Sequence, residues 1–303
     1  MHYRKFSTYL RQTYGEKVYK IPISLDGTCP NRDGLVGVGG CTICSEGGVG
    51  FELHHSAKPI KDQLRLNKAH ISQKYRADKF IIYFQNYTTT YRAIDDIVDL
   101  IKQVDGDDVA EIALSARPDT LSDELLKVLA AYPKKIVLEL GVQLFNDQIL
   151  QDINRGHDTQ AILDAFERIN HYGLTVCAHL ILNLPGATME DTLTAVETLN
   201  RYQIERVKLH SLYIPKGSAI AKDFLAGEVE MIGPMDYYDR LEEFIKRAHP
   251  DMVIERLFGR APEEDSLFCN WDRSWRYLQN EFERRLEEKQ IFQGEMYYET
   301  KHL

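Results

Sequence analysis

The sequence predicts an α/β fold built on a parallel sheet, and two observations support this prediction. Short apolar segments alternate with helical segments over about two hundred residues, the pattern of repeated β–α units. Polar residues also gather where those segments end, for example Gln85, Arg117, Gln143 and Asn183. Such clustering is typical of the functional end of a (β/α) barrel. From the pattern alone, an open doubly wound sheet and a barrel, complete or partial, both remain possible.

The predicted elements follow one another with short connections. Strands are expected at 18–25, 80–84, 109–115, 136–142, 175–182 and 207–213, and helices at 60–75, 94–103, 123–132, 159–172 and 190–202. Ser122 is the N-cap of the helix at 123–132 and is followed by two acidic residues. Gly173 ends the helix at 159–172. The first strand is not followed by a G-x-G-x-x-G turn that leads into a helix, which disfavours a dinucleotide-binding unit.

The pattern weakens after Tyr213, where the sequence predicts a helix at 236–248, a strand at 252–257 and a charged helix at 275–289. No linker, repeat or low-complexity run separates these elements from the preceding ones. We therefore expect a barrel domain over 1–220, including a basic N-terminal segment, and a C-terminal α/β extension over 221–303 that packs on it.

Composition is that of a soluble globular protein, with 44% hydrophobic and 27% charged residues. No run of eighteen apolar residues is present, and the first residues lack the apolar core of a secretory signal, so a cytoplasmic protein without a membrane partner is expected. The sequence gives no indication of the oligomeric state.

The distribution of charge is uneven. The chain carries a net charge of −9, yet residues 1–80 hold 13 Lys/Arg against 7 Asp/Glu. Cations such as Arg4, Lys5 and Arg11 alternate there with tyrosines, the arrangement on which an RNA strand can stack while its phosphates are neutralised. The alternative is that the segment 58–76 is a helix with a solvated basic face.

Three of the five cysteines lie within sixteen residues. Cys29, Cys41 and Cys44 have the spacing C-x11-C-x2-C, in a glycine-rich loop directly after the first strand. Three thiolates can hold three irons of a [4Fe–4S] cubane and leave the fourth iron open to S-adenosylmethionine (SAM), whose reductive cleavage gives a 5′-deoxyadenosyl radical. A zinc site is the alternative, with His54 or His55 as the fourth ligand. Cys177 and Cys269 are interpreted as buried structural thiols, and His179 and His210 as core histidines bonded to backbone.

Several motifs resemble those of the YtqA/YhcC family of radical SAM proteins, to which the MnmL-like enzymes belong. They are TCPNRDG at 28–34, GCTICS at 40–45, FQNYTTTY at 84–91, SARPD at 115–119, ELGVQ at 139–143, INRGHD at 153–158, HLILNLPG at 179–186 and the segment 208–218. The motifs span most of the chain in order. This family is related to the radical SAM domain of the Elongator catalytic subunit, which modifies wobble uridines in tRNA.

The resemblance implies a partial (β/α)6 barrel, a [4Fe–4S] cluster on Cys29, Cys41 and Cys44, and bound SAM. It implies SAM contacts by residues after the second strand, at and beyond the fourth strand, and within the sixth: Gln85, Asn86, Tyr87, Gln143, Arg155, Leu209 and Tyr213. No Gly-Gly-Glu-Pro motif follows the second strand, so the methionyl contact there departs from the usual pattern.

The function implied by the resemblance is modification of the C5 side chain of a wobble uridine, with carboxymethylaminomethyl-uridine converted to aminomethyl-uridine. tRNA would be the substrate, and flavodoxin or ferredoxin the electron donor. Two alternatives stay open. The first is a radical SAM enzyme that acts on a small metabolite or a peptide, and the second is a non-enzymatic, zinc-stabilised RNA-binding module.

Overall fold

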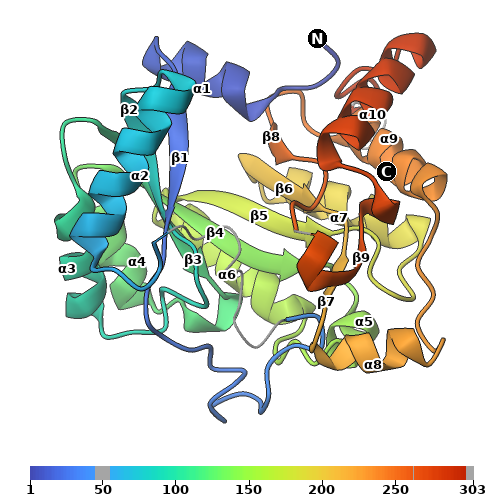
Figure 1. The fold of residues 1–303 in the computed structure, drawn as a ribbon, viewed down its shortest axis with the longest axis horizontal. Coiled ribbons are helices and arrows are strands. Elements are labelled where there is room, and N and C mark those ends of the chain that lie inside the picture. The colour runs from blue at the N-terminus through green and yellow to red at the C-terminus, as the bar shows by residue number, and fades with distance from the viewer. Residues whose placement is uncertain (45–54, 262, 298–303) are drawn as a thin grey trace.

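The computed structural model describes residues 1–44, 55–261 and 263–297 and shows a parallel sheet curled into a half-barrel (Figure 1). The strand order is β1-β2-β3-β4-β5-β6-β8, with every neighbouring pair parallel. The strands are β1 Val18–Ile23, β2 Lys79–Phe84, β3 Val109–Ala116, β4 Lys135–Gln143, β5 Thr175–Ile181, β6 Arg206–His210 and β8 Val253–Arg256. The predicted partial barrel is thus confirmed, and the strand predicted at 252–257 joins it as a seventh strand.

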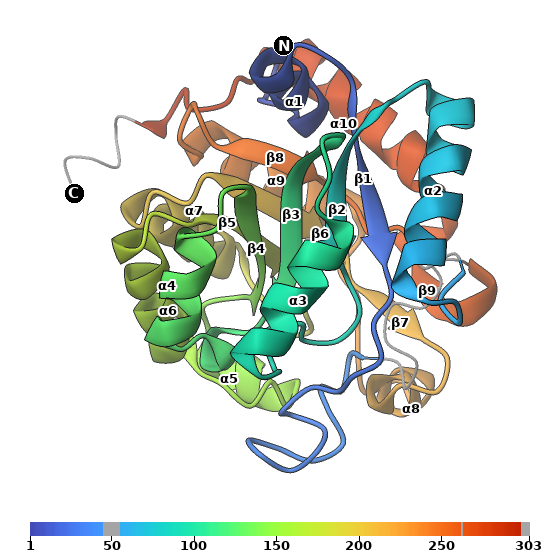
Figure 2. The same cartoon turned by 90° about the vertical axis from the view of Figure 1, so that its left-hand side faces the viewer.

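Helices cover the outer side of the sheet, as Figure 2 shows for α3, α4 and α6. The helices that follow the strands are α2 Ile60–Tyr75, α3 Ile94–Val104, α4 Asp123–Ala130, α5 Asp147–Asp152, α6 Thr159–His171, α7 Met189–Arg201, α8 Ala219–Leu225, α9 Pro234–Arg247 and α10 Trp275–Lys289. The Ser122 hydroxyl accepts a hydrogen bond from the backbone N–H of Leu125, so the predicted N-cap is present. No helix in the described residues is long and apolar enough to cross a bilayer.

Elements before the first strand and after the sixth differ from the prediction. The predicted strand 207–213 ends at His210, and Tyr213 instead begins β7 (Tyr213–Pro215), which pairs antiparallel with β9 (Ser266–Cys269). The helix α1 (Phe6–Tyr14) was not predicted. Phe6, Tyr9 and Leu10 have helical spacing, and this apolar face packs against the inward residues at the amino ends of the strands. A division of the chain at 220 stays a prediction.

Alternation along each strand decides which residues enter the half-barrel. Val207 and Leu209 of β6 point outward into the core shared with the helices, whereas Arg206, Lys208 and His210 point inward. At the bottom, Arg206 donates two hydrogen bonds of 2.7 Å to the Glu111 carboxylate of β3, and both side chains are buried. The Tyr14 hydroxyl of α1 donates to the same carboxylate at 2.7 Å. An ion pair and a helix therefore close the amino end of the half-barrel.

Replacing Arg206 with Met is expected to lower the free energy of unfolding by about 3–5 kcal/mol, because it leaves the Glu111 carboxylate buried without its cation. The double change Arg206→Met and Glu111→Leu should recover most of that loss. Chemical denaturation followed by circular dichroism measures both. Lys102→Met is the matched control, since its partner Asp99 is exposed and the pair contributes about 1 kcal/mol or less. An equal effect of Arg206→Met and Lys102→Met would contradict this role for the buried pair.

Candidate active site inside the half-barrel

A cavity of about 1200 Å³ occupies the concave side of the sheet. This volume exceeds the roughly 300–1,000 Å³ typical of a pocket for one small ligand, so two ligands can lie in it together. Residues at two levels line the cavity: the cysteine loop at the carboxyl ends of the strands and a charged layer in their middle. The three predicted cluster cysteines, Cys29, Cys41 and Cys44, all line it.

The cysteine loop is held by buried polar side chains of a later segment. Arg155 places Nη1 3.4 Å from the Cys41 Sγ and donates from Nη2 to the Gly141 carbonyl at 2.6 Å. Asn31, which is fully buried, places Nδ2 3.5 Å from the same sulfur and donates to the carbonyl of Asn154. A Cβ on Gly141 would meet Arg155 Nη2 at 2.5 Å, which explains why the strand carries glycine there. These contacts tie the loop to the end of β4.

The surroundings favour a thiolate at Cys41. A hydrogen bond from the Cys44 thiol, helped by Arg155 and opposed by burial, lowers the pKa of Cys41 to about 4. Within the described residues, Arg155 Nε, Arg117 Nη1 and Asn31 Oδ1 are buried without a hydrogen-bond partner. The three thiols thus lie near arginine N–H groups that have no acceptor among the described residues. This combination suits an anionic iron–sulfur cluster and a ligand with a carboxylate. The residues present therefore fit the predicted group.

The structure gathers most, but not all, of the predicted SAM-contact residues. Gln85, Tyr87, Gln143, Arg155 and Tyr213 all line the cavity. Two of them, Tyr87 and Gln143, have left-handed backbone angles, with φ of 52° and 72°, and Gln143 lies at a bulge in β4 that redirects its side chain.

Two predicted contacts lie outside the cavity lining. Leu209 is part of the core between the sheet and the outer helices, because its position in β6 has the outward parity. Asn86 also does not line the cavity, and its Oδ1 is buried without a hydrogen-bond partner among the described residues. Their roles as SAM contacts gain no support from these positions.

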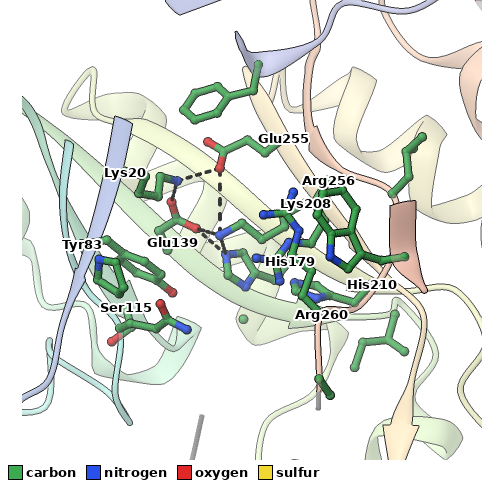
Figure 3. A pocket seen from close by; sticks show the side chains of 18 of the residues that line it. Lys20, Tyr83, Ser115, Glu139, His179, Lys208, His210, Glu255, Arg256 and Arg260 are labelled. Carbon is green, nitrogen blue, oxygen red and sulfur yellow. Dashed lines mark hydrogen bonds and ion pairs between the residues drawn. The ribbon is translucent and has the colours of Figure 1, made fainter. Parts of the chain in front are cut away.

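A charged layer across the middle of the cavity was missed by the sequence analysis (Figure 3). It consists of one inward residue from each of five strands, namely Lys20, Glu139, His179, Lys208 and Glu255. The interpretation of His179 as a core histidine bonded to backbone was wrong, because its Nε2 lies 2.5 Å from the Glu139 carboxylate and its ring faces the cavity. His210 also lines the cavity, with its ring centroid 5.5 Å from that of His179. Inward parity was the signal that could have identified these residues.

The zinc alternative receives no support from the histidine that the structure describes. His55 is exposed and does not line the cavity, and His54 lies outside the described residues. Cys177 and Cys269 are buried, as expected. The Cys177 thiol has a pKa raised well above its ordinary value by burial, which is typical of an inert structural cysteine.

The mouth of the cavity is basic and aromatic. Across the described lining, twelve Lys or Arg side chains face two carboxylates, Glu139 and Glu255. Five of the cations are exposed and define the basic mouth: Arg11, Lys17, Lys74, Arg260 and Arg276. Aromatic rings lie among them, including the stacked pair Tyr19 and Tyr75, whose centroids are 4.6 Å apart. Trp275 is flanked by the guanidinium groups of Arg260 and Arg276, at 4.0 and 4.8 Å from its ring centroid.

Comparisons with known proteins agree with this geometry. The family model of the Radical SAM superfamily matches residues 29–199, and the Radical_SAM C-terminal domain matches residues 204–288. Uncharacterized protein YtqA of Bacillus subtilis is 28% identical over 97% of this chain and 92% of its own length. Protein YhcC of Escherichia coli is 33% identical over 86% of this chain and 85% of its own length.

Two more distant similarities bear on fold and on partners. A tRNA-2-methylthio-N(6)-dimethylallyladenosine synthase of Thermotoga petrophila is 27% identical over 52% of this chain and 38% of its own length. The solved structure of Methanocaldococcus infernus Elp3 superposes with a TM-score of 0.66 and 17% identity, covering 94% of this chain and 68% of that one. At 17% identity, this similarity shows that the chain and Elp3 share a fold and nothing beyond that.

Replacing any one of Cys29, Cys41 and Cys44 with Ala is expected to abolish the SAM-dependent change in the EPR spectrum of the reduced protein. The protein would first be reconstituted anaerobically with iron and sulfide, and the spectrum recorded with and without SAM. Cys177→Ala and Cys269→Ala are the controls and should keep the wild-type response, since both thiols are buried and neither lines the cavity. A normal response in any of the three loop variants would remove that residue from the ligand set.

Proposed function

The chain belongs to the radical SAM superfamily, and on this premise we propose that it is an enzyme that modifies a base of tRNA. Members of the superfamily use a [4Fe–4S] cluster and SAM, so these are its cofactors. When bound, they supply one-electron cleavage of the sulfonium and abstraction of a hydrogen atom from the substrate. The superfamily assignment supports an enzyme and argues against the alternative of a zinc-stabilised module without catalytic activity.

The chain's own residues have three tasks in this proposal. Cys29, Cys41 and Cys44 hold the cluster, with Arg155 and Asn31 directing N–H groups at the Cys41 sulfur. Gln85, Tyr87, Gln143 and Tyr213 line the level of the cavity next to the cysteine loop, where SAM would lie. The closed amino end of the half-barrel keeps solvent from entering from below. A flavodoxin or ferredoxin would donate the electron.

The observation that carries the tRNA proposal is the basic mouth on a chain whose net charge is −9. Exposed cations alternate there with stacked rings, which neutralises phosphates and provides faces for unpaired bases. A cavity inside the barrel also suits a base turned out of its stack, as enzymes that act on bases require. The similarity to a tRNA-modifying synthase points the same way.

Within tRNA, we propose the C5 side chain of the wobble uridine as the site of modification, with carboxymethylaminomethyl-uridine converted to aminomethyl-uridine. The support is the ordered set of motifs that resemble the YtqA/YhcC family. Nucleosides from cells with and without the protein test it: loss of the chain should raise the first nucleoside and deplete the second. An unchanged nucleoside profile would contradict the proposal and favour a small-metabolite or peptide substrate.

Charge reversal at the basic mouth is expected to weaken tRNA binding. Lys74→Glu and Arg276→Glu should each raise the dissociation constant. Each should also lower the slope of log K against log salt by about 0.7–0.9 for every phosphate that the protein no longer neutralises. Lys127→Glu is the control, because this exposed residue lies on α4, outside the cavity lining. Anaerobic binding titrations over a range of salt concentrations provide the measurement.

Two of the three cations first expected to dock RNA are poorer sites for this test. Arg4 pairs with Asp251 at 3.2 Å and Lys5 with Glu283 at 2.6 Å, so reversing either charge would also disturb the fold. Arg11 is exposed and lines the cavity, and it belongs with Lys74 and Arg276. Unchanged affinity and salt slope in all three reversals would remove the basic mouth from the tRNA interface.

A further inference from the structure

The Glu139 carboxylate is the centre of the charged layer in the cavity (Figure 3). Lys20 and Lys208 donate to it at 2.5 and 2.6 Å, and Nε2 of His179 lies 2.5 Å from it. Lys20 also reaches Glu255 at 2.6 Å. Glu139 itself is 2% exposed, so these contacts replace water around its charge.

These contacts determine which nitrogen of His179 carries the proton. Burial raises the pKa of Glu139, but Lys20 and Lys208 outweigh it and hold that pKa well below its ordinary value, so the carboxylate is ionised. An ionised carboxylate only accepts hydrogen bonds, so the 2.5 Å contact requires a proton on Nε2 of His179. The Lys208 ammonium, 3.3 Å from Nε2, has no acceptor there and directs its hydrogen bond to Glu139.

The remaining ring nitrogen of His179 is consequently a hydrogen-bond acceptor. Within the described parts of the chain, no protein group hydrogen-bonds to its Nδ1, and the ring lines the cavity. Burial and the Lys208 charge lower the pKa of His179 to about 4, against the opposing effect of Glu139. The imidazole is therefore neutral across the physiological pH range. The other titratable groups around it are Lys20, Cys177, His210 and Glu255.

A metal ion does not account for this arrangement. Ligand atoms of Glu139, Cys177 and His179 lie within 4.8 Å of one another. However, the Lys208 ammonium lies 2.6 Å from the carboxylate and 3.3 Å from the imidazole, and a second ammonium, Lys20, binds the other carboxylate oxygen. Two ammonium groups therefore already neutralise the carboxylate that a metal ion would need as a ligand.

We propose that His179 reads the imide edge of a uracil base, its Nδ1 accepting the N3–H of the base. This inference rests on the proposed function and deepens it by assigning the recognition of the base. Arg256, the neighbour of Lys208 across β6 and β8, also lines the cavity and is a cationic donor for a carbonyl of the base. Glu139 acts as a positioning residue, because it fixes the tautomer that makes Nδ1 an acceptor.

The order of donors and acceptors makes this edge selective. Uracil carries an N3–H donor between two carbonyl acceptors, and this N–H complements the neutral Nδ1 acceptor of His179. Neutral cytosine offers a ring nitrogen lone pair where uracil has N3–H, so two acceptors would face each other without a hydrogen. A site built to bind an N–H in this way discriminates strongly against an analogue that lacks it.

The first test measures the tautomer of His179 in the wild-type protein by ¹⁵N NMR of its imidazole nitrogens, before any cofactor or RNA is added. The expected result is a protonated Nε2 and an unprotonated Nδ1 at neutral pH. In Glu139→Gln, the new amide can donate to Nε2, so the Nδ1–H tautomer should grow. An Nδ1–H tautomer or an imidazolium in the wild type at neutral pH would overturn the inference.

The second test measures binding of a synthetic anticodon stem–loop with uridine or cytidine at the first anticodon position. The protein carries its cluster and SAM, and no reductant is added, so no turnover occurs. The wild type should prefer uridine by about tenfold or more. That preference should hold from about pH 5.5 to 8, since His179 becomes charged only as the pH falls towards its pKa.

His179→Ala and Glu139→Gln should lose most of the preference while keeping affinity from the basic mouth. His70→Ala is the control, because His70 also lines the cavity but is exposed on α2. Iron content and circular dichroism establish that each variant is folded. A wild type that binds the stem–loops without preference, or a preference that survives in folded His179→Ala, would overturn the recognition inference alone. A wild type that binds neither stem–loop would overturn the tRNA proposal, and the recognition inference with it.

Discussion

The ion pairs of Lys20 connect the two edges of a sheet that does not close. Lys20 is on β1 and Glu255 on β8, the first and last strands in the sheet order, and their side chains meet at 2.6 Å across the open side. The same ammonium reaches Glu139 on the central strand β4. Hydrogen bonding between strands alone would leave the curvature of this sheet free to vary. One half-buried cation shared by three strands fixes it, and with it the width of the cavity.

Three groups of functional residues lie at different heights along the strands. The cysteine loop lies at the carboxyl ends, the charged layer in the middle, and the Arg206–Glu111 pair beneath it. This order follows from strand alternation, because each inward position of a strand belongs to one level. Charges at the lower two levels are matched by partners. The exposed cations of the basic mouth do not belong to this order, because Arg11 is on α1, Lys74 is near the end of α2 and Arg276 is on α10.

Much of this architecture could be predicted from sequence, since short apolar segments and helix caps are local signals. The boundaries of α2 and α10 were predicted to the residue, and the cysteine loop was identified from spacing. Partners distant along the chain left no such signal. Lys20 and Glu139 are 119 residues apart, and nothing local marks them as a pair. The family resemblance implied a SAM contact at Leu209, but this residue points outward, and Lys208 and His210 are the inward residues of β6.

The position of α1 has a consequence for the order in which the chain folds during synthesis. The residues before this helix are held by the far end of the chain: the backbone N–H of Ile254 donates to the Arg4 carbonyl, and Tyr3 and Lys5 bind Glu283 of α10. Residues 3–5 therefore cannot dock until Ile254 and Glu283 have been synthesised. Until then the amino end of the half-barrel is open, and the Arg206–Glu111 ion pair is exposed to water. Synthesis of α10, and not of the barrel strands alone, is what allows the amino end of the half-barrel to close.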